Sequence, residues 1–112
     1  MYWTQGIHRG LERHMQHDFR TNDLRRMATD LHFDGGFSRE IVAAYRRRIQ
    51  SIRAAIDERP LRNVKAHRFE KLKGARAHQH SMRLNDQWRL ILEFGQQEGE
   101  KVIHIVDIED YH

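Results

Sequence analysis

The spacing of apolar residues changes from a helical to a strand repeat near the middle of this chain. After Ser38, apolar side chains recur every three or four residues, which places them on one face of a helix. They are Ile41, Val42, Tyr45, Ile49, Ile52 and Ile56. After Asn63 apolar and polar residues alternate, as in strands buried on one side. This order predicts an α+β fold, with two to three helices packed on one face of a twisted, largely antiparallel sheet of about four strands.

Caps and turns set the expected limits of these elements. Asn22 and Asp23 can cap a brief helix that runs to Leu31, and Ser38 can cap the longer helix. The expected strands cover residues 67–72, 79–84, 87–94 and 101–108, with a short additional strand first within 14–20.

Length and composition exclude several kinds of protein. The 112 residues suit one domain, and residues 1–13 show no sustained repeat, so we interpret them as a poorly defined extension before a single domain over 14–112. No apolar run approaches the ~20 residues of a membrane-spanning helix. The absence of cysteine excludes disulfides and thiolate metal sites and is typical of the cytoplasm, where we expect the protein.

Positive charge is concentrated in the middle of the chain. The segment 38–89 holds 14 Lys/Arg against 5 Asp/Glu, whereas the segment 90–112 holds 6 acids against one lysine. Arginine provides 16 of the 20 cations, and its guanidinium binds phosphate through two parallel hydrogen bonds. The pattern indicates a polyanion-binding patch, although a solvated arginine-rich surface accounts for it equally well.

Strand alternation collects cations on the sheet face that the helices would leave open. Arg89 lies opposite the apolar stripe that includes Trp88, so it shares its face with Arg83 on the neighbouring strand. Further cations flank Gly74 near the edge of that face, namely Lys71, Lys73 and Arg76. Together they can cradle phosphates, and the competing explanation is a solvated strand face.

The last expected strand leads directly to three residues that can handle protons: Asp110, Tyr111 and His112. RNA cleavage without a metal needs a base for the 2′-hydroxyl, an acid for the leaving 5′-oxygen and cations around the phosphorane. A histidine such as His112 can titrate near neutral pH, and Tyr111 can donate a proton or stack on a base. Asp110 can orient a neighbouring side chain or accept a proton. The structural alternative is that the terminal aromatic residues cap the core.

Other polar residues have structural explanations at least as good as functional ones. His78 and His80 would point the same way on a strand and form half a metal site, but no third ligand stands nearby, so we expect no metal and no cofactor. His104 lies within an apolar strand, where a hydrogen-bonded structural histidine is the simplest interpretation. Glu70 is either a general base or one half of a strand ion pair.

Three ordered motifs resemble the HigB branch of the RelE/ParE toxin superfamily, from about Leu24 to the end of the sequence. They are Phe-Glu-Lys-Leu-Lys-Gly-Ala-Arg at 69–76, His-Ser-Met-Arg-Leu-Asn-Asp-Gln-Trp-Arg-Leu at 80–90 and Val-Asp-Ile-Glu-Asp-Tyr-His at 106–112. The resemblance implies a small microbial-RNase-like fold and a ribosome-dependent endonuclease that cuts mRNA in the decoding site without metal. It also implies a helix-turn-helix antitoxin of the HigA type, through which alone the protein would contact operator DNA.

Roles follow from the motifs position by position. The resemblance assigns Asp110, Tyr111 and His112 to catalysis, Arg89 to the scissile phosphate and Lys73 to RNA contact. The full set of expected RNA-binding residues is Arg68, Lys71, Lys73, Arg76 and Arg83.

The chain departs from some relatives at one catalytic position. It has Glu70 where those relatives have a second catalytic histidine, and His67 would point to the opposite face of the expected strand. Glu70 is therefore the candidate partner of His112.

Two other functions fit the same superfamily. One is a ParE-like poison of DNA gyrase, which would have no need of an acid/base pair at the terminal Tyr-His. The other is an inactive member that binds only its antitoxin or RNA. Both remain alternatives to the nuclease.

Overall fold

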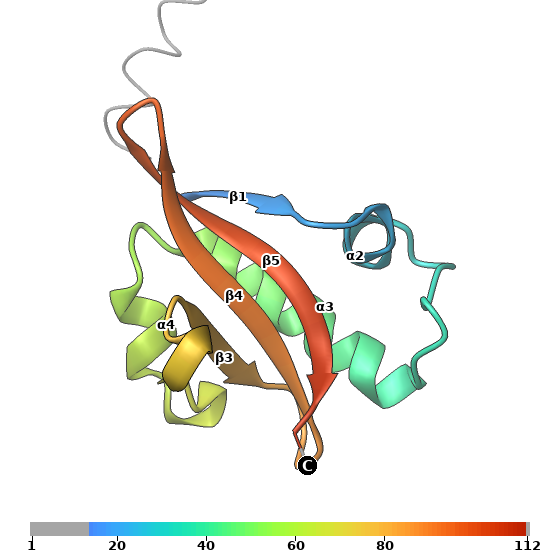
Figure 1. Cartoon of the computed structure of the whole chain (residues 1–112). Helices are drawn as coiled ribbons and strands as arrows, with labels where there is room; N and C mark the ends of the chain where they lie inside the picture. The colour runs from blue at the N-terminus through green and yellow to red at the C-terminus, as the bar shows by residue number, and fades with distance from the viewer. Residues whose placement is uncertain (1–13, 112) are drawn as a thin grey trace, which may run out of the picture.

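The computed structural model describes residues 14–111, which form three α-helices and a five-stranded sheet (Figure 1). The helices are α2 (Asn22–Thr29), α3 (Arg39–Ala54) and α4 (Arg59–Asn63). The strands are β1 (Gln16–Phe19), β2 (Glu70–Lys71), β3 (Gln79–Arg83), β4 (Trp88–Gln97) and β5 (Glu100–Asp110). Two short 3-10 helices are η1 (Lys65–His67) and η2 (Gly74–Arg76). The expected extension over 1–13 and the terminal His112 lie outside the described residues.

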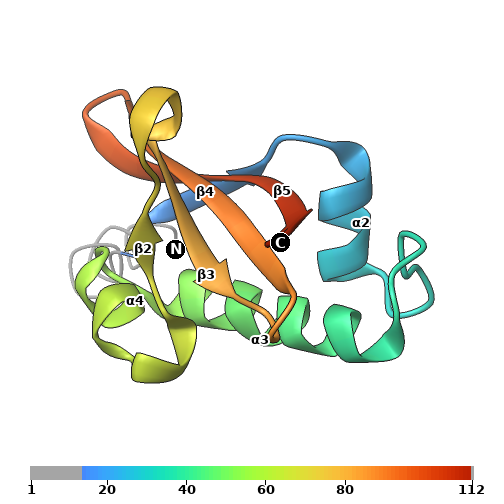
Figure 2. The same ribbon diagram turned by 60° about the horizontal axis from the view of Figure 1, so that its bottom comes forward.

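The strand order in the sheet is β1-β5-β4-β3-β2. The neighbours β2–β3, β3–β4 and β4–β5 are antiparallel, and β1 pairs in parallel with β5, from Gln16 opposite Val102 to Phe19 opposite Ile105. Figure 2 shows α3 crossing below the strands, so the helical layer covers one side of the sheet. The α+β fold is confirmed, and the fifth strand is the short strand expected within 14–20.

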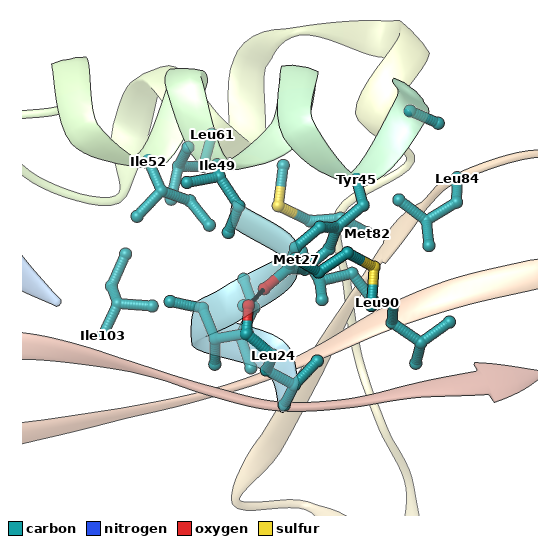
Figure 3. Packing of buried hydrophobic residues seen from close by; sticks show 14 of the residues in the cluster. Leu24, Met27, Tyr45, Ile49, Ile52, Leu61, Met82, Leu84, Leu90 and Ile103 are labelled. Atoms are coloured by element: carbon teal, nitrogen blue, oxygen red, sulfur yellow. Dashed lines mark hydrogen bonds between the residues drawn. The ribbon is translucent and has the colours of Figure 1, made fainter. Parts of the chain in front are cut away.

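The core lies between α3 and the covered face of the sheet (Figure 3). The hydroxyl of Tyr45 on α3 donates to the carbonyl of Leu24 at 2.6 Å and so ties α2 to α3. The side chains with almost no exposure include Met27, Tyr45, Ile49, Ile52, Leu61, Met82, Leu90, Leu92, Ile103 and Ile105. Burying each large aliphatic side chain contributes about 1.5–3 kcal/mol, so this layer positions the sheet that carries the candidate site.

Helix α2 is shorter than its apolar spacing predicted, and its cap is a different residue. The hydroxyl of Thr21 accepts from the Leu24 amide at 3.2 Å, so Thr21 is the N-cap rather than Asn22. The helix ends at Thr29 because the chain turns at Asp30, whose carboxylate accepts from the His32 amide at 2.9 Å. The expectation that the helix reaches Leu31 is wrong, and Leu31 is 78% exposed.

Helix α3 confirms the Ser38 cap, since the Ser38 hydroxyl accepts from the Ile41 amide at 3.2 Å. Its stripe stops earlier than expected, because the helix ends at Ala54 and Ala55 is extended. The carbonyl of Ala55 accepts from the Met15 amide at 2.9 Å. Ile56 consequently lies beyond the buried stripe and is 66% exposed, contrary to the sequence prediction.

The strand expected over 67–72 is reduced to β2. His67 belongs to η1 instead, and Arg68 has a left-handed backbone with φ 43°, which interrupts an extended chain. The imidazole of His67 is buried and its Nδ1 lies 2.9 Å from the Leu61 carbonyl. The prediction that His67 points to the opposite face of the sheet assumed a strand at this position, and the structure has a 3-10 helix there instead. The buried imidazole of His67 supports the fold through its contact with Leu61.

Strands β4 and β5 form a hairpin longer than predicted, with residues 95–97 paired rather than looped. The turn residues Glu98 and Gly99 both have positive φ, at 52° and 82°, as tight hairpin turns require. The register shifts between Ile91 and Leu92, which pair with Asp107 and Ile105 and leave Val106 as the extra residue of a bulge. The bulge sets the orientation of the final residues of β5. Within 14–111, no helix has the length and apolar character needed to cross a membrane.

Candidate functional site

Arg89 on β4 is the centre of the candidate site. It lies on the sheet face away from the helices, as alternation predicted, but only 5% of the residue is exposed. Its Nε and Nη2 donate to the Ser81 hydroxyl oxygen at 3.2 and 2.8 Å, and Nη2 also donates to the Arg68 carbonyl at 2.6 Å. The expected open face is therefore closed at this point, and the guanidinium is held by Ser81 on β3 and by the Arg68 carbonyl in the turn between η1 and β2.

The charge of Arg89 is balanced from two sides. A carboxylate oxygen of Glu70 lies 3.8 Å from Nη2, and the guanidinium carbon lies 5.0 Å from the centre of the Tyr111 ring. Burial lowers the pKa of Arg89 from its usual value, while Glu70 and Tyr111 oppose the shift. Because the pKa of an arginine side chain lies far above neutral pH, Arg89 keeps its positive charge despite this shift, and the cation lies against the Tyr111 ring.

A pocket of about 210 Å³ opens beside Arg89, at the carboxyl end of β5. It is lined by Leu72, Arg76, Ser81, Arg89, Ile91, Glu109, Asp110 and Tyr111. Four residues proposed from the sequence meet in this lining, namely Arg76, Arg89, Asp110 and Tyr111. The pocket thus places cations and carboxylates around one small volume with an apolar side.

The end of β5 is held by the turn that precedes β4. The side-chain amide nitrogen of Gln87 donates to a carboxylate oxygen of Asp110 at 3.0 Å, and the Tyr111 backbone N–H donates to the backbone carbonyl of Gln87 at 2.6 Å. Tyr111 remains 55% exposed, so its ring covers Arg89 while facing solvent. His112, the strongest acid/base candidate from the sequence, lies outside the described residues.

Arg76 reaches the same pocket from η2. Its Nη1 and Nη2 donate to the two carboxylate oxygens of Glu109 at 2.9 and 2.8 Å, and its Nε donates to the Gln79 side chain at 2.8 Å. The hydrogen bonds that Arg76 donates to Glu109 raise the pKa of Arg76. Gly74 begins η2 with φ 64°, a conformation that suits glycine and turns the chain towards the pocket.

The other expected RNA-binding residues are distributed around the site rather than gathered within it. Arg68 is exposed and contributes its carbonyl to Arg89, and Arg83 forms an ion pair with Asp86 at 2.5 Å. Lys73 is exposed just before η2.

Neighbouring residues of β2 point to opposite faces of the sheet. Glu70 pairs with Ser81 and so shares the face of Arg89, with half of its side chain exposed. Lys71 pairs with His80, which places it on the other face. A residue pair adjacent in the sequence is therefore divided between the two sides of an edge strand.

Ser81 and Glu109 were not among the site residues proposed from the sequence. The parity of β3 already placed Ser81 on the face of Arg89, and that signal could have identified it. The pairing of Glu109 with Arg76 joins β5 to η2, and no local pattern indicates such a contact.

Three further histidines that the sequence analysis considered have structural partners or neighbours, namely His78, His80 and His104. His78 lies 3.7 Å from a carboxylate oxygen of Glu93, whereas His80 stacks on Phe69 on the helix-covered side, so the two do not point the same way. The Nδ1 of His104 lies 2.6 Å from an Asp18 carboxylate oxygen. Among residues 14–111 no three potential metal-ligating side chains form a cluster.

Comparisons with known proteins agree with this architecture. A family model described as the RelE-like toxin of the type II toxin-antitoxin system HigB matches residues 8–112, starting within the segment that we set aside as an extension. The structure is similar to a solved "YoeB/ParE toxin from Agrobacterium tumefaciens", with a TM-score of 0.56 and 16% identity over 88% of this chain and 100% of that chain. At that identity the likeness establishes the fold alone. No curated protein matches the chain significantly.

Proposed function

Because the chain belongs to the HigB-like family of RelE-like type II toxins, we propose that it is a ribosome-dependent, metal-independent endoribonuclease that cleaves mRNA in the decoding site. The observation that supports this most directly is Arg89, a buried cation fixed between Ser81 and Tyr111 beside a pocket at the end of β5. A cation held in this way can stabilise charge that develops on a phosphate without any reorganisation. Cleavage would inhibit translation and arrest growth in the cytoplasm.

The chemistry divides among five residues. Arg89 steadies the scissile phosphate, Glu70 takes the 2′-hydroxyl proton and His112 protonates the leaving 5′-oxygen. Tyr111 stacks on a base or donates a proton, and Asp110, which Gln87 holds, orients its neighbours. Glu70 suits its role because it lies on the face of Arg89 with half of its side chain accessible.

Substrate binding rests on the cations around the pocket. Phosphates on either side of the scissile bond would contact Arg68, Lys73, Arg76 and Arg83, whereas Lys71, on the other face of the edge strand β2, would contact RNA that passes around this edge. Arg76 lines the pocket itself, and the other cations lie around it, so together they would bind the RNA backbone as it enters the pocket.

Membership of a type II family implies an antitoxin partner. We propose a helix-turn-helix antitoxin of the HigA type, which would also provide the only link to operator DNA. Its co-expression should restore growth.

The test is brief expression in bacterial cells, with mRNA ends mapped by primer extension. The wild-type chain should arrest growth and produce ends within translated codons, whereas Glu70→Gln and His112→Ala should not. Arg47→Gln, on the exposed face of α3, is the matched control and should remain toxic. Intact mRNA together with a DNA-damage response would contradict the proposal and favour a gyrase poison. Absence of any growth effect would favour an inactive binding member.

A further inference from the structure

The hydrogen-bonding capacity of Arg76 is already occupied. A guanidinium offers two edges for bidentate pairing, one between its terminal nitrogens and one along Nε. Glu109 occupies the first edge through both carboxylate oxygens, and Gln79 occupies Nε. A phosphate can therefore pair with Arg76 in bidentate fashion only if one of these two partners leaves.

The two partners differ in how firmly they are held. The side-chain amide nitrogen of Gln79 donates to the Glu93 carboxylate at 2.8 Å, and this carboxylate also accepts from Arg20 at 3.0 Å. A continuous series of hydrogen bonds therefore crosses the sheet face, from Arg20 through Glu93 and Gln79 to Arg76. This series of hydrogen bonds holds the Nε edge of Arg76, so the guanidinium keeps its position when the edge between its terminal nitrogens changes partner.

Glu109 is the partner that can leave. The side chains of Arg76 and Glu109 are 46% and 33% exposed, and ion pairs this exposed contribute little to stability. Both residues line the pocket next to Asp110 and Tyr111, so the pair stands where RNA would enter. An incoming phosphate is repelled by the Glu109 carboxylate and attracted by the guanidinium that this carboxylate covers.

We propose that Glu109 is an internal competitor for Arg76, whose terminal edge it occupies until a backbone phosphate of single-stranded RNA replaces it. The inference rests on the proposed function, because it assigns a substrate phosphate to the same pocket. It goes further by identifying a residue, Glu109, that limits RNA affinity. In the free protein Arg76 is therefore paired with Glu109, and it exchanges this partner for a phosphate when RNA binds.

The test measures RNA binding by the isolated full chain rather than cleavage. The probe is a single-stranded RNA oligonucleotide with 2′-O-methyl groups throughout, which cannot be cut, and fluorescence anisotropy gives Kd over a series of salt concentrations. Glu109→Gln should bind about three- to tenfold more tightly than wild type, since one repulsive charge is removed and Arg76 is released. Arg76→Gln should lower the slope of log K against log salt by about 0.7, the value for one lost phosphate contact on a single strand.

Two comparisons separate the exchange from a general charge effect. Asp107 is another acid on β5, and among the described residues it has no hydrogen bond to Arg76. Asp107→Asn therefore removes a negative charge without releasing Arg76, and it should tighten RNA binding less than Glu109→Gln. In the Arg76→Gln background, Glu109→Gln should lose most of its gain, as coupled residues do.

The proposal is overturned if Arg76→Gln leaves the salt slope unchanged, or if Glu109→Gln tightens binding no more than Asp107→Asn. Weaker binding by Glu109→Gln would also overturn it, because Glu109 would then position Arg76 rather than compete for it. Circular dichroism and thermal melting should first establish that each variant is folded. Mapping of mRNA ends tests the proposed nuclease separately, so a failure of this inference can be distinguished from a failure of the proposed function.

Discussion

The Ser81 hydroxyl on β3 accepts two hydrogen bonds from the buried guanidinium of Arg89 on β4, at 3.2 and 2.8 Å. Ser81→Ala would leave Nε of a buried cation without its acceptor, and such a loss costs about 1–3 kcal/mol. We expect the free energy of unfolding to fall by that amount in urea titrations with an unchanged m-value.

The matched control for this prediction is Ser51→Ala. Among the described residues, the Ser51 hydroxyl on α3 has a local hydrogen bond, to the Arg47 carbonyl at 3.3 Å, and its loss should change stability by less than about 0.5 kcal/mol. Equal stabilities of the two variants would show that Ser81 does not support Arg89.

Tyr111 contacts Arg89 through its ring, so the ring and the hydroxyl can be separated by substitution. Tyr111→Phe keeps the aromatic face 5.0 Å from the guanidinium carbon, whereas Tyr111→Ala removes a cation–π contact worth about 0.5–1 kcal/mol at an exposed site. Unfolding titrations should place the phenylalanine variant near wild type and the alanine variant lower by that amount. A loss of stability in Tyr111→Phe would mean that the hydroxyl has a structural partner.

Gly95 on β4 gives space to His104 on β5. A Cβ at Gly95 would lie 2.9 Å from Nε2 of His104, so Gly95→Ala must displace an imidazole that Asp18 holds at 2.6 Å. We expect a loss of about 1–2 kcal/mol in the free energy of unfolding. In the His104→Ala background the same substitution should be neutral or slightly stabilising, and a persistent loss would show that the backbone, not the ring, demands glycine.

His80 should make stability depend on pH. Its ring stacks on Phe69, its Nδ1 has no hydrogen-bond partner among the described residues, and its pKa is lowered by burial and by Arg62 and Lys71, with Glu58 opposing. Below the ordinary pKa of 6.5 the unfolded chain therefore binds more protons than the folded chain at this site, so stability falls as pH drops from 6.5 towards the lowered pKa.

The measurement is unfolding in urea at pH 7.5 and at pH 5.5. His80→Phe keeps an aromatic ring in place and should show a smaller loss between the two conditions than wild type does. The pKa of His17 is lowered as well, mainly by burial, so His17→Gln should remove a separate part of the loss. An unchanged pH dependence in His80→Phe would assign the whole effect to other groups.

Local repeats were sufficient for much of the fold. The apolar stripe of α3 and its Ser38 cap follow from spacing and one side chain, and both are found. The alternation around Trp88 correctly placed Arg89 on the face away from the helices. Leu31 and Ile56 carry the same periodic signal but are exposed, because a turn or an extended residue ended each helix before them.

By itself the sequence determined the order of the two longer helices and of the strands, the faces of β3 and β4, and the placement of Asp110 and Tyr111 at the end of the last strand, but it did not indicate α4. These properties depend on residues close together in the chain, where a repeat of two or of three to four residues specifies direction. Only the tertiary structure decided that Arg89 is buried, that Ser81 and the Arg68 carbonyl bind it and that Arg76 is paired with Glu109. The reason is that hydrogen bonds between distant segments depend on sheet register, on the bulge in β5 and on the turn at η2, which local repeats do not encode.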